Sequence, residues 1–182
     1  MNDIIFRTED FIIEDGAMLG LSSTGREKLF KNESNLEING DYLDETITSI
    51  GDPEKEEFLF LGVLITELRI KNLPDLEMIE ENAFTGVGLQ FVYLENLPSL
   101  ESIEAYSFNY NCIRHLFIDD CDELKFICYE AFAYNQIYHL NLSKLKNLTY
   151  VGALAFGNNR IEEYLPPRKE CEVSRDAFLI YS

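Results

Sequence analysis

The amino-acid sequence predicts a solenoid, a fold in which short repeated units stack on one another, and three sets of residues predict it. Phenylalanine recurs every 24 residues, at Phe84, Phe108, Phe132 and Phe156. Aliphatic residues keep the same interval in several columns, one of which is Leu76, Leu100, Leu124 and Leu148. Asparagine keeps it at Asn111, Asn135 and Asn159, with Val87 in the slot of the first unit.

A period of roughly 20–29 residues with this leucine pattern is typical of leucine-rich-repeat solenoids. One unit cannot bury its own apolar face, so the units stack and bury a continuous core. We therefore expect a right-handed leucine-rich-repeat solenoid, a horseshoe or superhelix. Its expected parts are a parallel sheet of short strands, short helical turns and an N-terminal cap made of a hairpin and a helix.

The unit at 89–112 shows how one repeat is read. Residues 91–95 alternate with period two, which predicts a strand with Val92 and Leu94 facing the core. Pro98 cannot donate to a ladder, so the strand should end before it. Residues 105–108 are expected to form about one helical turn, and Asn111 should end the unit by bonding nearby backbone groups or taking the left-handed conformation.

These columns resemble the BspA-like leucine-rich repeats of bacterial surface and adhesion proteins. The residues that carry the resemblance in the central unit are Leu116-x-Ile118, Leu124-x-x-Ile127 and Ala131-Phe132 followed by Asn135. The resemblance covers roughly Asn35 to the C-terminus. It implies the fold, and it implies a bacterial, cell-surface setting with adhesion to a host or matrix protein.

We expect one domain over residues 1–182, and residues 1–35 should form its N-terminal cap. Two short apolar runs flank Asp15-Gly16, which predicts a hairpin. A serine or threonine at 22–24 should then begin a short helix that ends near Asn32.

The remaining chain divides into three parts. A degenerate repeat is expected at 36–63, with a strand at 36–38, a second apolar segment at 47–51, Phe60 in the phenylalanine column and a polar loop at 53–57. Four repeats of 24 residues fill 64–160. Residues 161–182 should form a C-terminal capping repeat, whose edge Pro166 and Pro167 protect against end-to-end association. We expect a monomer.

Composition excludes several classes of protein. The net charge of −18 argues against binding to nucleic acid or to an anionic membrane surface. No apolar run approaches the roughly 18–20 residues of a membrane span. The four cysteines match no zinc pattern, and we expect all four to be reduced, with Cys121 buried in a leucine column.

Motifs for catalysis are missing from the sequence. It has no nucleophile elbow, zinc-protease motif, phosphate loop or dinucleotide fingerprint. His115 and His139 should be neighbours on adjacent strands. They could form a metal pair or a pH-sensitive patch, or be two surface residues inherited by duplication, and we favour the last. The acidic run at 119–123 lacks the spacing of a calcium loop. We expect no catalytic residues, no cofactor and no metal.

The candidate site is the outward face of the long sheet. Side chains in the outward columns are not needed to form the core, so large apolar residues there indicate another role, such as binding. The alternatives are that strands simply favour aromatic residues, or that the N-terminal cap covers them. The predicted partner-binding surface consists of Arg69, Phe91, Tyr93, His115, Phe117, His139 and Asn141.

Three functions compete on this reading. The first is a non-enzymatic module that binds a protein partner at the bacterial cell surface. The second is a cytosolic or phage-borne interaction or inhibitor protein, which the reduced cysteines and the absence of a signal-peptide pattern in residues 1–11 favour unless a signal has been removed. The third, an enzyme acting on carbohydrate, needs paired carboxylates in a cleft, and no columns place them there.

Overall fold

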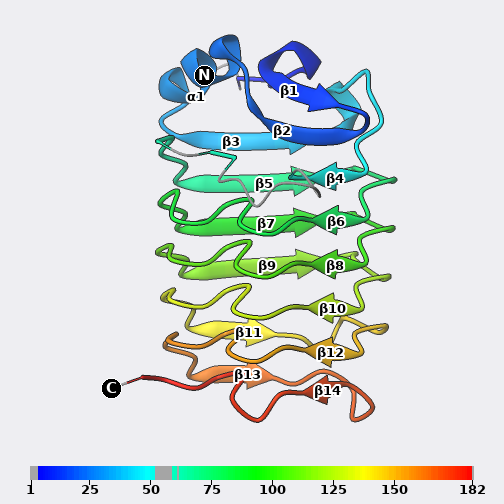
Figure 1. Ribbon diagram of the computed structural model, residues 1–182, viewed down its shortest axis with the longest axis vertical. Helices are drawn as coiled ribbons and strands as arrows, with labels where there is room; N and C mark the ends of the chain where they lie inside the picture. The colour runs from blue at the N-terminus through cyan, green and yellow to red at the C-terminus, as the bar shows by residue number, and fades with distance from the viewer. Residues whose placement is uncertain (1–3, 52–58, 61, 182) are drawn as a thin grey trace.

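The chain winds into a stack of coils, and most coils contribute one strand to each of two sheets (Figure 1). The computed structural model describes residues 4–51, 59–60 and 62–181. The polar loop expected at 53–57 lies outside the described residues. The predicted leucine-rich-repeat solenoid is confirmed, as are the hairpin and the helix at its N-terminal end.

The first sheet has six parallel strands, which carry the outward columns. In spatial order they are β13 (Glu163–Leu165), β11 (His139–Asn141), β9 (His115–Asp119), β7 (Phe91–Glu95), β5 (Glu67–Lys71) and β3 (Asn35–Asn39). Strands β5, β7 and β9 pair without a shift, so that Arg69, Tyr93 and Phe117 lie side by side. Alternate residues of these strands are buried, as the period of two predicts.

The second sheet has eight strands, most of them two residues long. In spatial order they are β1 (Phe11–Glu14), β2 (Ala17–Leu21), β4 (Ser49–Ile50), β6 (Met78–Ile79), β8 (Ser102–Ile103), β10 (Phe126–Ile127), β12 (Tyr150–Val151) and β14 (Glu172–Val173). Strands β1 and β2 are the antiparallel pair of the predicted hairpin, and the others run parallel. The hairpin therefore extends this sheet beyond the repeats.

One hydrophobic core runs through the stack from Phe6 to Ala177. Its axis is the phenylalanine column, whose rings stack at centroid distances of 5.0, 5.3, 4.9 and 5.4 Å from Phe60 to Phe156. The residue before each repeat phenylalanine is small and buried, as at Ala83 and Ser107. A larger side chain there would separate the coils, so the small column and the aromatic column depend on each other.

The helical turn expected at residues 105–108 is wrong. Two successive tight turns replace it, with the Ser107 N–H bonded to the Glu104 oxygen at 3.3 Å and the Asn109 N–H to the Tyr106 oxygen at 3.0 Å. Tyr106 has a φ of +57°, which no right-handed helix accepts. The N–H of Phe108 bonds to Ala131 of the next coil at 2.8 Å, so the backbone here serves the stack and not a helix.

The asparagine column forms a ladder between coils. The Asn135 amide nitrogen donates to the carbonyl oxygens of Phe108, Phe132 and Ala133 at 2.9, 3.1 and 3.1 Å. Its oxygen accepts from the Ile113 N–H at 3.0 Å. Asn111 and Asn159 make equivalent bonds. The expected bonding to backbone is confirmed, but no residue of this column has a positive φ; Tyr110 and Tyr134, just before two of them, take the left-handed conformation.

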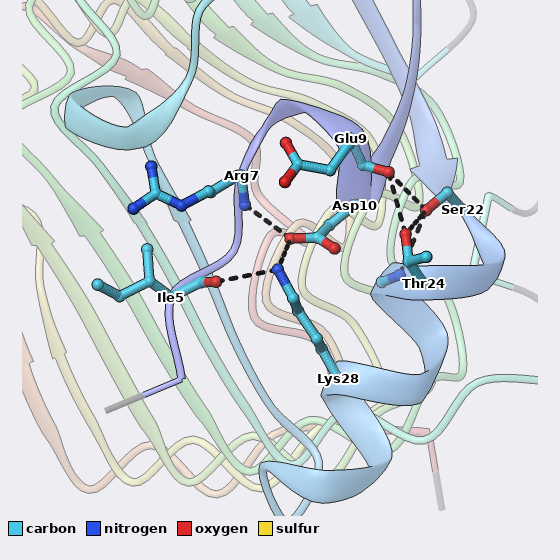
Figure 2. A network of polar contacts seen from close by, with 8 residues as sticks. Ile5, Arg7, Glu9, Asp10, Ser22, Thr24 and Lys28 are labelled. Carbon is cyan, nitrogen blue, oxygen red and sulfur yellow. Dashed lines mark hydrogen bonds and ion pairs between the residues drawn. The ribbon is translucent and has the colours of Figure 1, made fainter. Parts of the chain in front are cut away.

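The N-terminal cap is held by a network of polar contacts around the buried Asp10 (Figure 2). The Asp10 side chain is fully buried; its Oδ2 accepts from the Arg7 N–H at 2.8 Å and pairs with the Lys28 ammonium of α1 (Ser23–Lys31). Lys28 also donates to the Ile5 carbonyl oxygen at 3.3 Å. A Cβ on Gly25 would lie 2.0 Å from the backbone carbonyl oxygen of Asp10, so only glycine lets α1 approach this segment so closely.

Two short 3-10 helices complete the cap and the first coil. They are η1 (Thr8–Asp10) and η2 (Gly40–Tyr42). Ser22 begins α1 by accepting the Gly25 N–H, and its hydroxyl donates to the Glu9 carbonyl oxygen at 2.8 Å. The helix is thereby tied to the segment that enters the hairpin.

Candidate functional site

The outward columns of β5, β7 and β9 carry two pairs of stacked rings. Phe91 and His115 stack at 5.2 Å with an interplanar angle of 1°, and Tyr93 and Phe117 stack at 5.0 Å and 2°. The two pairs adjoin, since the His115 and Phe117 centroids are 6.4 Å apart. In-register parallel pairing causes this, because it sets equivalent side chains of neighbouring strands one strand spacing apart.

Arg69 closes one end of the Tyr93–Phe117 stack. Its guanidinium carbon lies 4.0 Å from the Tyr93 ring centroid, a cation–π contact. Glu95 accepts from it at 2.8 Å, and Glu67 lies at 3.5 Å. Partial burial lowers the pKa of Arg69, but the hydrogen bond and charge of Glu95, with the charges of Glu67 and Tyr93, together raise the pKa above its ordinary value. The guanidinium stays charged and is held in one orientation.

These five residues form one surface, which we call the aromatic face: Arg69, Phe91, Tyr93, His115 and Phe117. Phe117 is 49% exposed, and Phe91 and Tyr93 are half-buried against their neighbours. The N-terminal segment borders the edge of this sheet, where Ile4 and Ile5 line a hollow of about 370 Å³ with Arg69. The N-terminal segment does not cover Phe117, which stays open to solvent.

The other two predicted site residues, His139 and Asn141, lie on β11. His139 is paired in register with His115, as expected, and its Nδ1 lies 2.7 Å from a Glu163 carboxylate oxygen. The Asn141 oxygen accepts from the N–H and the hydroxyl of Ser143. Both residues border a hollow of about 340 Å³ beside Phe117 and Asp119. The seven residues therefore lie on one sheet, but β11 is paired with the aromatic face only through His139 and His115.

A second exposed stack lies outside the outward columns of this sheet. Tyr110 and Tyr134 stack at 4.4 Å and 7°, in the turn that precedes the asparagine column. Tyr110 is 62% exposed. These two rings lie outside the predicted partner-binding surface. They give the aromatic face a natural control, because the chemistry is the same and the location differs.

Several residues of the face were not predicted as site residues. Glu67 and Glu95 hold Arg69, and Lys144 pairs with Asp119 at 2.8 Å across the hollow. The hydrogen bond to Asp119, and then its charge, raise the pKa of Lys144. For two of these residues the sequence contained a signal, because Glu95 and Asp119 follow Tyr93 and Phe117 by two residues on the same strands.

The described residues offer little that could bind a metal or perform nucleophilic chemistry. No group of three or more His, Cys, Asp or Glu side chains gathers among them in a way that could hold a metal ion. The cysteines are free thiols; burial raises the pKa of Cys121 to about 12 and that of Cys128 to about 11. Cys121 is buried in its leucine column, as predicted. Such thiols are poor nucleophiles because the thiolate is scarce.

Within the described ranges, no helix has both the length and the apolar character needed to cross a bilayer.

Comparisons with known proteins agree with the geometry. A family model described as BspA type leucine rich repeat region matches residues 55–180, in six copies. No curated protein and no solved structure matches the chain.

Proposed function

The chain belongs to the BspA-type leucine-rich-repeat family, whose repeats are typical of protein-interaction modules and typically carry no enzyme activity; from this premise we propose that it binds a protein partner through the outward face of its six-stranded sheet. The observation that carries the proposal is the aromatic face. Its rings lie in columns that the core does not use, and Phe117 is 49% exposed.

The chemistry of this face is that of a binding hot spot. Aromatic and arginine side chains dominate the energy of protein interfaces, particularly near their centres. Stacking and the ion pairs of Arg69 fix these side chains in advance, so little conformational entropy is lost when a partner binds. We therefore expect this face to bind its partner without a conformational change.

We propose a bacterial cell-surface setting, in which the partner is a host or matrix protein and the module acts as a monomer. The support is the family, together with an outward face that needs no second copy to be complete. Fractionation of the source cells with an antibody against the solenoid tests the setting, because surface protein is removed by protease treatment of intact cells. Light scattering of the purified protein tests the monomer.

A cytosolic or phage-borne interaction or inhibitor protein is the second candidate. The four free thiols favour it, because disulfides form in oxidising compartments and free cysteines persist inside cells. Both candidates use the same face. They differ in where the partner is found, and fractionation separates them.

The face is tested by comparing two double variants in a binding assay. The assay measures binding to an immobilised extracellular-matrix preparation and, separately, to an immobilised cytosolic extract of the source cells. Tyr93→Ser with Phe117→Ser should leave the fold intact and weaken binding by about 2 kcal/mol or more. Tyr110→Ser with Tyr134→Ser removes an equal stacked pair and should bind like the unaltered protein. Equal binding by both variants would place the site elsewhere.

A further inference from the structure

The six-stranded sheet opens on one side between β9 and β11. Strands β7 and β9 share five residue pairs, whereas β9 and β11 share only His115 with His139. The inward residues beside this gap, Leu116 and Ile118, are 9% and 8% exposed, while the equivalent Val92 and Leu94 are at 0%. The second sheet stays paired at the same level, through β10 and β12. We call this one-sided gap the opening.

A change in the column that ends each strand accounts for the opening. Asn72, Asn96 and Asp120 occupy that column with φ values of +55°, +52° and +52°. The next residue in the column is Lys144, which is not left-handed; asparagine and aspartate tolerate that conformation best.

Strand β11 consequently ends early. Asn141 captures the N–H of Ser143 at 3.0 Å, a local bond that competes with the ladder. In the preceding coils the Asn72 N–H bonds to the Glu95 oxygen and the Asn96 N–H to the Asp119 oxygen. Within the described part of the chain, no equivalent bond joins the Asp120 N–H to Ser143.

The opening is lined by an aromatic ring and by carboxylates. Its volume is about 340 Å³. Since Tyr93 covers one face of the Phe117 ring and the strand order is β5, β7, β9, β11, the other ring face is turned toward the opening. Glu95 and Asp119 border the same hollow. The next residue of this outward column is Asn141, not a ring.

The other end of the Tyr93–Phe117 stack shows which kind of side chain binds to a ring face with carboxylates beside it. There Arg69 lies over Tyr93 and is held by Glu95 and Glu67. Phe117, with Asp119 beside it, presents the same combination of ring face and carboxylate to the opening. Lys144 now binds Asp119 at 2.8 Å, but both side chains are more than half exposed, so an incoming cation can replace it. The net charge of −18 favours a basic partner.

We propose that the opening between β9 and β11 receives an arginine side chain of the protein partner, stacked on Phe117 and paired with Asp119. The inference rests on the proposed function, because it names the chemistry of the segment that binds to this face. Arginine fits better than lysine because its planar guanidinium stacks on a ring and donates two bonds to one carboxylate.

The test is an NMR titration of the ¹⁵N-labelled protein with the capped tripeptide acetyl-Gly-Arg-Gly-amide. The control peptide replaces arginine by citrulline, which keeps the shape and removes the charge. The backbone amide signals of Phe117, Asp119 and Asn141 should shift with the arginine peptide, and the citrulline peptide should bind at least about fivefold more weakly. The amides of Tyr110 and Tyr134 should not move.

Matched charge variants separate a local site from general attraction to an acidic surface. Asp119→Asn should weaken the arginine peptide about fivefold, and Lys144→Ala should tighten it about twofold by freeing Asp119. The neighbouring exposed pair Lys146–Asp122, at 3.4 Å, provides the controls Asp122→Asn and Lys146→Ala, which make the same charge changes outside the opening. These controls should leave the affinity unchanged.

Two outcomes overturn the inference: shifts spread over the acidic surface, or an effect of Asp122→Asn as large as that of Asp119→Asn. Failure here is distinct from failure of the proposed function. If the arginine peptide does not bind but the Tyr93 and Phe117 double variant still loses the matrix or cytosolic partner, the face recognises a segment without arginine.

Discussion

At its N-terminal end the solenoid is covered by added structure, whereas at its C-terminal end the last coil itself forms the surface. The hairpin and α1 lie across the first coil (Figure 1). Phe6 and Phe11 are buried, and Asp10 with Lys28 ties the helix to the segment entering the hairpin. Strand β2 pairs with β4, so β4 is not an edge strand of its sheet.

The C-terminal end keeps the repeat pattern but not its burial. Tyr164 pairs with Leu140 in an inward column, yet it is 37% exposed where Leu140 is 1% exposed. Phe178 extends the phenylalanine stack on Phe156 at 5.8 Å and is only half-buried. Tyr164, Phe178 and Ile180 line a hollow of about 200 Å³ at this end.

The comparison shows two ways to end a stack of coils. One end buries its first coil under new structure, which is held by an ion pair between the buried Asp10 and the partly exposed Lys28. The other leaves a strand of three residues, β13, directly followed by Pro166 and Pro167, which gives an approaching strand little to pair with. Covering stabilises the end; shortening the edge protects it. The following variants test that distinction.

The centre of the stack sets the scale against which both ends are measured. Phe132→Ala removes a fully buried ring that stacks on Phe108 and Phe156, and should lower the free energy of unfolding by about 3–5 kcal/mol. For a chain of this size the thermal midpoint should fall by about 10 °C. Phe126→Ala, in the same coil but 41% exposed, is the control and should cost under about 1 kcal/mol. A midpoint close to that of the unaltered protein would mean that the column is not a packed core.

The N-terminal cap should respond almost as strongly. Asp10→Ala leaves the Arg7 N–H and the Lys28 ammonium without their carboxylate, and should cost about 2–3 kcal/mol, less than a fully buried pair because Lys28 is one-third exposed. Glu9→Ala removes an adjacent, exposed carboxylate side chain whose backbone oxygen alone serves the network, and it should cost little. Urea unfolding followed by circular dichroism measures both. Equal costs would show that the network in Figure 2 does not hold the cap.

The C-terminal end should respond less. Phe178→Ala removes a half-buried ring from the last position of the stack, and should cost about 1–2 kcal/mol. Hydrogen exchange should locate the loss in β13 and β14. A cost as large as that of Phe132→Ala would show that the last coil is packed as tightly as the centre, and the contrast between the ends would disappear.

The smallest effect concerns reactivity and leaves stability unchanged. Burial raises the pKa of both Cys121 and Cys171, to about 12 for Cys121, which lies in the centre with 2% exposure. A raised pKa means less thiolate at any lower pH, so labelling by a disulfide reagent is slow and speeds up as the pH rises. At pH 8, Cys121 should react at least about tenfold more slowly than Cys171 near the open end. Mass spectrometry of the labelled peptides gives the order, and the reverse order would contradict the assignment of the open end.

Most of the fold could be predicted because the core residues that determine it recur at a fixed interval. A column such as Phe84 to Phe156 appears four times at one interval, so each unit supports the reading of the others. The turn at Tyr106 was misread because the sequence shows a small residue and an aromatic one but not the backbone conformation. Asn82, Glu130 and Leu154 occupy the same column with positive φ, and their identities share no property that marks a left-handed position.

The site could be predicted only in part. The aromatic face followed from strand register, which the repeat determines. The opening did not, because it arises where the pattern fails: Lys144 replaces Asn72, Asn96 and Asp120 in one column, and Asn141 then bonds locally. The cap network was also missed, since nothing in the sequence around Asp10 indicates that this carboxylate is buried.

The asparagine ladder also has a consequence for the order in which the coils can be completed during synthesis. Asn135 bonds the Phe108 oxygen and the Ile113 N–H, and Asn159 bonds the Phe132 oxygen and the Ile137 N–H, so each asparagine completes backbone groups that precede it by 22–27 residues. On a ribosome, which makes the N-terminal end first, a coil is finished only after the asparagine of its successor has emerged. In the order of synthesis, the N-terminal coils therefore have their asparagine partners before the C-terminal coils do.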